Sequence, residues 1–561
     1  MINPGARADR SLRAVGGLVR RAVGPLGTCA AVLVAFSLAT PAASAARPLG
    51  GNVNGQAPWT ADFAFANAFV TASTPRPLEP DGSLDLDSSV PLDGNGWPKA
   101  DFGVYVSEVA PPPGNYSISG SSTRRPTVGL RLTPGTVGPL TWDSRNRRFR
   151  VTVRVDSQGT PGLHGRLILT FRNTGGGVRG LRVVRPGHDA YRHPVFSDRY
   201  ISFLRAHRPT VLRTMDLTAT NNNPVARWSE RTLPGRWGMR TLSRRIATDW
   251  APAGEVLTSE RGMAWEYAIE LCNRVGSDCW INIPLHADDD YVRRLAALVE
   301  SRLSSRLKVW VEYSNEVWND GFWQTGANRR LALADLAAGR GRLAWDGDRD
   351  PVSLGDRRVA ARAVAIGRIF RSTFGSSASR VRTVLAFQYA NPDRTRNQLE
   401  YVAAVHGRPS SLLSAIAIAP YVNLGFDPDG ESLDVPGLTT DGVLGLLSED
   451  IDGFAGSPFM PTWRTLSTRF SLPLVAYEGG PDTFGPNNID AKTSATLDPR
   501  MRGLVERYLG AWFAQGGGQF NWYTLGADPY GHRYGTWSIS DSITRLDSPK
   551  SLGFMSVRDG S

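Results

Sequence analysis

The chain has 561 residues and a formal net charge of +12. Only four of its 64 basic residues are lysines, and no basic run carries interleaved aromatic residues, which argues against a nucleic-acid-binding protein. A general bias towards arginine explains the charge better than a partner-directed surface, although an acidic polysaccharide partner would also suit it. The length exceeds what one hydrophobic core usually serves, so we expect two domains.

Residues 1–45 have the features of an export signal. A basic leader with five arginines precedes the short apolar run 29–38, and Ala43-Ser44-Ala45 provides the small residues that signal peptidase reads. The apolar run is too short to cross a bilayer, and no other segment is long and apolar enough, so we expect no membrane anchor. The sequence therefore predicts a soluble monomer that is secreted or periplasmic after the signal peptide is removed.

Residues 46–178 have the pattern of an all-β domain. Short strands alternate with turns marked by proline and glycine, and no helical period of useful length occurs, which favours a β-sandwich. The strands expected most clearly are 101–106, 127–132, 148–154 and 165–171.

After Gly175-Gly176-Gly177 the pattern changes to strands that alternate with helices, such as 262–275 and 289–303. Eight such units predict a (β/α)₈ barrel over residues 179–561, since no G-x-G-x-x-G motif supports a doubly wound sheet. The eight expected strands are 180–184, 210–215, 279–283, 309–313, 382–387, 415–419, 474–477 and 519–523.

Two cysteines remain after the leader, Cys272 and Cys279. In an exported protein they could form a disulfide between a helix and the next strand, or they could be two buried thiols. No cysteine and histidine cluster has the spacing of a zinc site, so we expect no metal.

Two glutamates follow apolar strands of the predicted barrel. Glu316 comes directly after Asn315 at the end of the fourth strand, and Glu478 follows the seventh strand before Gly479-Gly480. The active site of a (β/α)₈ barrel lies at the carboxyl ends of its strands. Cleavage of a glycosidic bond with retention needs two carboxyl groups about 5 Å apart, one as acid and one as nucleophile. A surface or ion-paired glutamate is the alternative interpretation of each residue.

This arrangement resembles the clan of retaining (β/α)₈ glycoside hydrolases that includes family 5 cellulases. That clan has Asn-Glu after strand four and a nucleophilic glutamate after strand seven. The resemblance implies that Glu316 is the acid and base, that Glu478 is the nucleophile, and that Asn315 supports substrate binding. Family 5 itself has His-x-Tyr after strand six, where this chain has Ala419-Pro420-Tyr421, so the family within the clan stays open.

The resemblance implies supporting roles for four more residues. Arg213 near the end of strand two would hold the nucleophile ionised, and Tyr421 after strand six would donate a hydrogen bond to it. His286 after strand three would contact the substrate, and Trp522 on strand eight would be a platform beneath the sugar. Ordinary alternatives are a helix cap for His286, a rim ion pair for Arg213 and barrel-mouth packing for Tyr421 and Trp522.

Together these features predict an exported retaining glycoside hydrolase that acts on a β-linked polysaccharide or oligosaccharide. We expect no cofactor, because carboxyl groups supply both protonation and nucleophilic attack. A non-catalytic carbohydrate-binding protein and a transglycosylase that uses the same intermediate are the two alternatives. The sugar, the linkage and the choice between endo and exo action are open.

Overall fold

The computed structural model describes residues 46–156, 165–189, 195–235, 262–427 and 431–560, and the backbone of two short strands at 244–247 and 256–259. The predicted signal peptide at residues 1–45 lies outside the described residues. Among the helices that are described, none is long and apolar enough to cross a membrane.

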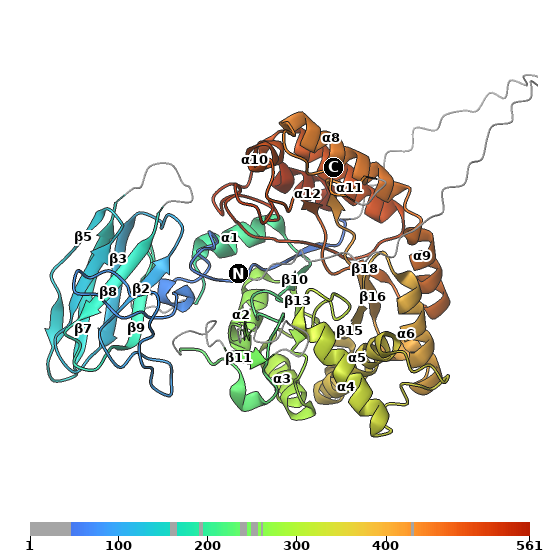
Figure 1. The fold of residues 1–561 in the computed structure, drawn as a ribbon, viewed down its shortest axis with the longest axis horizontal. Helices are drawn as coiled ribbons and strands as arrows, with labels where there is room; N and C mark the ends of the chain where they lie inside the picture. Colours follow the sequence, from blue (N-terminus) through green and yellow to red (C-terminus); the bar gives the residue numbers. More distant parts are fainter. Residues whose placement is uncertain are drawn as a thin grey trace, which may run out of the picture.

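Eight parallel strands close into a barrel, in the right-hand part of Figure 1. Seven of them are strands that the sequence predicted for the barrel, so the (β/α)₈ fold is confirmed. In order around the barrel they are β1 (Leu49–Asn52), β10 (Val211–Arg213), β13 (Asp278–Ile283), β14 (Val309–Tyr313), β15 (Val381–Ala386), β16 (Ala415–Ile418), β18 (Leu474–Ala476) and β20 (Phe520–Trp522).

The first barrel strand is not the one that the sequence predicted. Strand β1 pairs with both β10 and β20 and so closes the barrel. The predicted first strand lies in β9 (Arg179–Val184), which pairs antiparallel with β3 (Gly114–Ser121) outside the barrel. The N-terminal sheets are therefore inserted between the first and second barrel strands, and the predicted border at residue 178 does not separate the two units.

Two glycines explain why β1 escaped the sequence pattern. The strand reads Leu-Gly-Gly-Asn, which has little intrinsic preference for a β-strand. Tertiary contacts nevertheless require small residues there. A Cβ atom on Gly51 would lie 2.3 Å from Cβ of Leu525, and one on Gly50 would lie 2.4 Å from the carbonyl oxygen of Val211.

The N-terminal region contains two antiparallel sheets, on the left of Figure 1. Along β7 (Arg148–Val155) exposed and buried residues alternate strictly, as in a strand with one face towards a core. Buried side chains from both sheets, including Phe102, Phe149 and Phe171, form a single cluster. One sheet has the order β2 (Phe102–Ser107), β8 (Leu167–Arg172), β4 (Thr127–Arg131), and the other has β5 (Gly135–Val137), β7, β3, β9, with β6 (Thr141–Asp143) also on β7.

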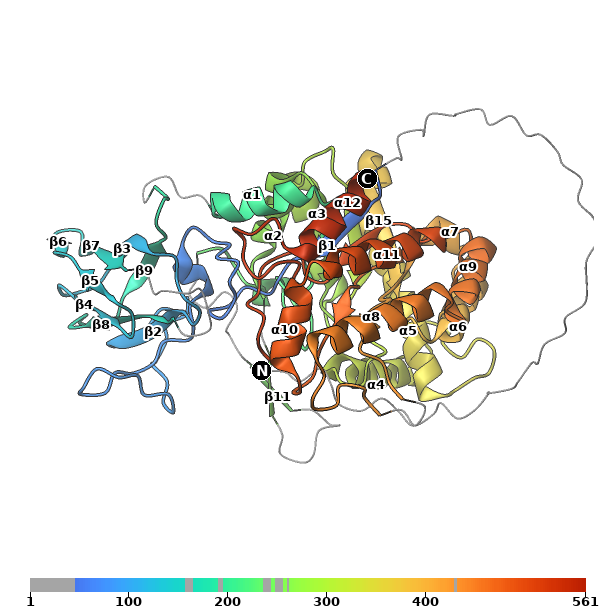
Figure 2. The same cartoon turned by 90° about the horizontal axis from the view of Figure 1, so that it is seen from above.

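Helices surround the barrel, as Figure 2 shows from above. Helix α3 illustrates why they form: the side chain of Asp288 accepts from the N–H of Tyr291, and buried residues recur at intervals of three and four. The helices that follow the barrel strands are α1 (Asp198–His207), α2 (Trp265–Val275), α3 (Asp289–Arg302), α4 (Trp323–Ala337), α5 (Pro351–Phe374), α6 (Pro392–Val405), α7 (Pro409–Leu412), α8 (Thr440–Ala455), α9 (Phe459–Phe470), α10 (Ile489–Leu497), α11 (Arg500–Ala514) and α12 (Pro549–Asp559).

The two cysteines are not bonded to each other. Cys272 on α2 and Cys279 on β13 are both buried free thiols, so of the two alternatives the structure shows the thiols.

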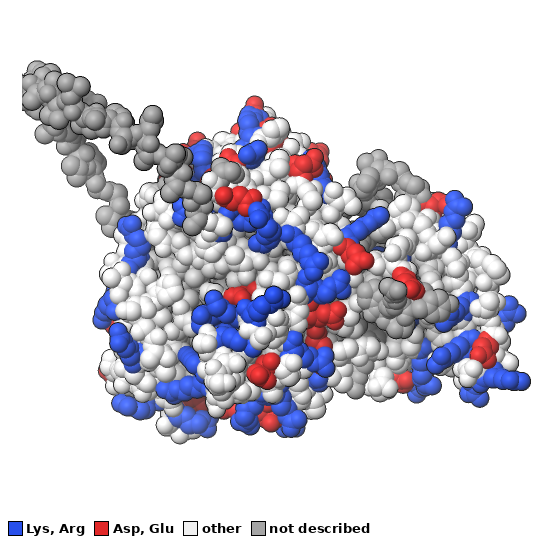
Figure 3. Space-filling view, turned by 180° about the vertical axis from the view of Figure 1, so that it is seen from behind, with Lys and Arg blue, Asp and Glu red and all other residues white. Residues whose placement is uncertain are grey.

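The net positive charge is dispersed: on the face in Figure 3, acidic side chains lie among the basic ones. Many arginines are paired, as Arg500 is with Asp441 and Asp498.

Candidate active site

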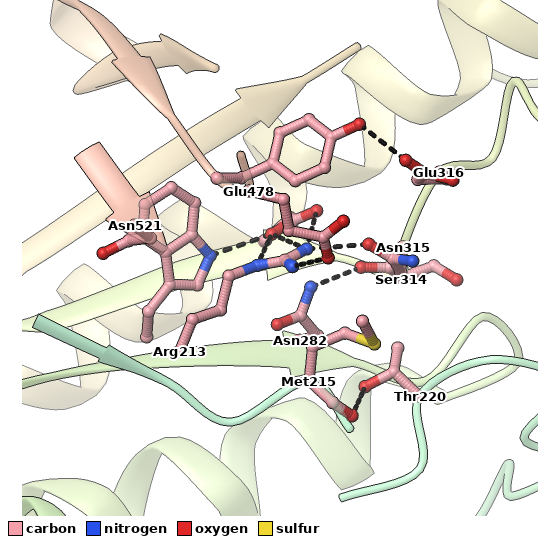
Figure 4. A network of polar contacts seen from close by, with 12 residues as sticks. Arg213, Met215, Thr220, Asn282, Ser314, Asn315, Glu316, Glu478 and Asn521 are labelled. Atoms are coloured by element: carbon pink, nitrogen blue, oxygen red, sulfur yellow. Dashed lines mark hydrogen bonds and ion pairs between the residues drawn. The ribbon is translucent and has the colours of Figure 1, made fainter. Parts of the chain in front are cut away.

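The predicted glutamates both lie at the carboxyl ends of barrel strands. Arg213 ends β10, Asn315 and Glu316 follow β14, and Glu478 lies two residues after β18. Because all eight strands are parallel, these ends meet on one face of the barrel. Figure 4 shows Glu478 beside Arg213, with Glu316 further along the same network.

The backbone turns sharply after β14 and separates two neighbouring side chains. Ser314 and Glu316 have φ angles of 57° and 41°, in the left-handed region that non-glycine residues rarely adopt. Asn315, between them, therefore points towards Arg213, while Glu316 points towards Tyr477. Strained backbone of this kind concentrates at functional sites.

Arg213 is the centre of the site, and its exposed fraction is 0%. All five of its N–H groups have acceptors. Nη1 donates to Glu478 at 2.6 Å and to Asn52 at 3.0 Å, and Nη2 donates to Asn315 at 2.7 Å. Nε and Nη2 both donate to Glu312, at 3.1 Å and at 2.9 to 3.0 Å.

Glu478 has the two contacts that the sequence predicted. Its Oε1 accepts from Arg213, and its Oε2 accepts from the hydroxyl of Tyr421 at 3.0 Å. The prediction that both residues reach hydrogen-bonding distance is confirmed. Burial raises the pKa of Glu478, as do the nearby carboxyls of Glu316 and Asp216, while Arg213 and Tyr421 oppose that rise.

Within the part of the chain that the structure describes, the donors to the Glu316 carboxyl group are all neutral. Oε1 accepts from the hydroxyl of Tyr477 at 2.9 Å, and Oε2 accepts from the amide of Asn319 at 2.9 Å. Burial raises its pKa as well. Two interacting carboxyls in one site favour a state with a single negative charge. Among the described residues, Glu478 contacts a cation directly and Glu316 does not, and this contact favours the ionised form of Glu478.

Sequence reasoning missed Glu312, which lies within β14 and is 2% exposed. Its carboxylate is bidentate to Arg213, and its Oε2 also accepts from the indole N–H of Trp280 at 2.8 Å. The available signal was a glutamate inside an otherwise apolar strand, since an acidic residue is almost never fully buried without a partner.

Asn315 is 2% exposed, and both ends of its side-chain amide contact other protein groups. Its Oδ1 accepts from Arg213, and its Nδ2 donates to Asn221 at 3.1 Å. Gln324 on α4 donates to both Asn221 and the Asn315 carbonyl oxygen, at 2.7 and 2.9 Å. The amide is thus fixed by protein partners, and the structure assigns it to the orientation of Arg213.

Trp522 lies differently from the expectation. Trp522 has an exposed fraction of 0%, its indole N–H donates to the carbonyl of Trp537 at 3.3 Å, and its ring meets Phe554 edge-on. With no ring face open, Trp522 is a packing residue and the predicted platform role is wrong. His286 packs against Trp323, with ring centroids 5.1 Å apart, and burial lowers its pKa.

A half-buried aromatic group lines the site beside Tyr421. Trp537 and Tyr523, from the segment after β20, meet the Tyr421 ring edge-on with centroids 5.4 and 6.2 Å away. Within the described part of the chain, no group of three or more histidine, cysteine or acidic residues could hold a metal ion.

Comparison with known proteins gives only distant likenesses. No family model and no curated protein matches the chain. A GH51 arabinofuranosidase from Xanthomonas axonopodis pv. citri is 12% identical, with 66% of this chain and 67% of that chain covered and a TM-score of 0.41. A family 1 β-glucosidase from Thermotoga maritima is 11% identical over 64% and 85%, with a TM-score of 0.34. Xylanase 10C from Cellvibrio japonicus is 11% identical over 87% and 97%, with a TM-score of 0.32. Likenesses this weak assign no family, so the site itself must support any function.

Proposed function

We propose that the protein is a retaining glycoside hydrolase that cleaves β-glycosidic bonds of an extracellular polysaccharide or oligosaccharide. The observation that carries the proposal is the unequal pair of glutamates. Among the described residues, Glu478 contacts a cation and a phenol, whereas Glu316 contacts a phenol and an amide, both neutral. A double displacement needs such a pair, with one carboxyl group ionised and the other protonated.

In the first step Glu316 gives its proton to the glycosidic oxygen while a Glu478 carboxylate oxygen attacks the anomeric carbon. The bond to the leaving sugar breaks as the glycosyl ester forms. In the second step Glu316, now ionised, takes a proton from water, and the resulting hydroxide displaces Glu478. Two inversions give net retention. Arg213 and Tyr421 stabilise Glu478 as a leaving carboxylate in this step.

The export of the protein belongs to the same proposal. A basic leader, an apolar run and small residues before position 46 support it, and a polymeric substrate outside the cell would explain why export is needed.

A panel of polysaccharides screened for new reducing ends would identify the substrate. Longer products at high substrate concentration would indicate transglycosylation, and absence of any product would indicate a carbohydrate-binding protein.

Replacement of each glutamate tests the roles. Glu316→Ala removes proton donation, so activity on poor leaving groups should fall far more than activity on activated aryl glycosides. Azide should then intercept the intermediate and give a β-glycosyl azide of retained configuration. In Glu478→Ala azide should attack directly and give the inverted product.

Glu300→Ala, on the exposed face of α3, is the control and should behave as the unchanged protein. Opposite stereochemical outcomes in the two variants would exchange the roles of the glutamates. Wild-type activity in both variants would place the site elsewhere.

A further inference from the structure

Glu312 is a buried acid that the two-step reaction does not use. It lies on β14 between the apolar residues Val311 and Tyr313, and its exposed fraction is 2%. A carboxylate in such a place is costly unless it is paired. A side chain that served packing alone would be apolar here, so its charge calls for an explanation.

The contacts of Glu312 lead to Glu478 through one guanidinium group. Arg213 turns its Nε and Nη2 edge towards Glu312 and its Nη1 towards Glu478. The positive charge of arginine is delocalised over the whole planar group. Two carboxylates at different edges of the same guanidinium therefore share one cation, and each weakens the attraction between the cation and the other.

We propose that Glu312 is a positioning residue that fixes the plane of Arg213 and takes up part of its charge, and so sets how readily Glu478 releases its proton. Without Glu312 the full cation would act on Glu478. That carboxylate would then ionise at lower pH but would be a weaker nucleophile, because a more stabilised carboxylate attacks less readily. The inference rests on the proposed function, whose nucleophile is Glu478.

Several other groups bear on the same charges. On the Glu312 side, Arg213 comes from β10 and the indole N–H of Trp280 from β13. The ring of Tyr477 lies 4.9 Å from the centre of the Arg213 guanidinium. Other titratable groups also lie near Glu312 or Glu478. They are Glu316 after β14, Asp216 after β10, Tyr421 after β16, Tyr477 and Tyr523. Of these, Arg213 alone is cationic, so the way its charge is divided is what differs between Glu312 and Glu478.

The deciding experiment uses Glu312→Gln, which has nearly the same shape and no charge. The acidic limb of kcat/KM reports ionisation of the nucleophile in the free enzyme. The variant removes the negative charge of Glu312, which contacts the same guanidinium as Glu478. The acidic limb should therefore move to lower pH by about one to two units. The plateau of kcat should fall several-fold, because Glu478 becomes a weaker nucleophile.

Asp356→Asn is the matched control. Asp356 is also held by two N–H groups of one arginine, Arg394, at 2.7 and 2.8 Å, but this pair joins α5 to α6 outside the barrel. Its acidic limb should coincide with that of the wild type. If Glu312 only oriented Arg213, Glu312→Gln would loosen Arg213 and move the limb upward, and an unmoved or upward limb would overturn the proposal.

Trp280→Phe is a second variant in case Glu312→Gln does not fold. It removes the N–H that favours ionised Glu312 and keeps an aromatic ring beside Arg213. Glu312 would be neutral more often, so the limb should move in the same downward direction by less than one unit. An upward movement would contradict charge sharing.

A measurement independent of activity separates the two proposals. Carbon NMR of protein labelled at the glutamate carboxyl carbons gives the titration midpoint of Glu478, identified by its loss in Glu478→Gln. The midpoint should fall in Glu312→Gln and not in Asp356→Asn. A lower midpoint in a protein without glycosidase activity would support charge sharing and reject the proposed function. An unchanged midpoint in an enzyme with glycosidase activity would support the proposed function and reject charge sharing by Glu312.

Discussion

Replacement of Tyr421 by phenylalanine should change the pH at which the site works more than it changes the site's shape. The Tyr421 hydroxyl donates to Oε2 of Glu478 at 3.0 Å. A hydrogen bond to a charged acceptor is worth about 1.5–3 kcal/mol. Phenylalanine keeps the edge-on contacts with Trp537 and Tyr523, so packing should change little.

The size of the shift follows from the burial of Glu478. Its exposed fraction is 5%, so little water can replace the lost hydroxyl. One pKa unit corresponds to about 1.36 kcal/mol, and the lost bond favours the ionised form, so the pKa of Glu478 should rise by about one to two units. The acidic limb of kcat/KM should move upward by that amount, opposite in sign to the shift expected for Glu312→Gln.

The assay is kcat/KM against pH on an activated aryl glycoside of the sugar identified by screening. Tyr401→Phe is the control, because it also removes a tyrosine hydroxyl with hydrogen-bond partners, the Gly341 carbonyl oxygen at 2.6 Å and Nε2 of His406 at 3.1 Å, but away from the site. A limb that stays in place, or that moves to lower pH, would show that Tyr421 does not stabilise ionised Glu478.

Three further outcomes can be checked together. Because burial raises the pKa of both Glu316 and Glu478, the pH profile of kcat/KM should be a bell with both limbs above the usual glutamate value, and an acidic limb near pH 4.5 would contradict the burial. Burial also raises the pKa of Asp62 to about 7, so its folded form binds a proton that the unfolded form has lost between about pH 4 and 7. The free energy of unfolding should therefore fall as pH rises through that window, by about 4 kcal/mol in all, and a denaturant titration of Asp62→Asn should lack this fall. Finally, a chain that begins at residue 179 should fail to fold, as judged by circular dichroism and a melting transition, since it lacks β1 and leaves the barrel open between β10 and β20; a cooperative melt would mean that β1 is dispensable.

Much of the barrel could be predicted from local sequence because its signals are local. Seven strands are short runs of apolar, mostly β-branched or aromatic residues, and helical periods separate them. Once the fold class is known, a polar residue at the end of such a strand falls on the active face. Glu316 and Glu478 were found in this way, and Arg213 and Tyr421 were found from the resemblance.

Only the tertiary structure decided which segments and side chains complete the site. Strand β1 is defined by the close approach of Leu525 and Val211 to two glycines, and a sequence window around Leu49 contains neither residue. Trp522 was expected to be a sugar platform, but its ring is buried and packs against Phe554. A local sequence window around Trp522 does not contain that partner. Glu312 faces Arg213 across 99 residues, and this pairing divides one positive charge between two acids. Strand patterns report which residues become buried, but the sharing of a charge depends on distances that exist only after the barrel has closed.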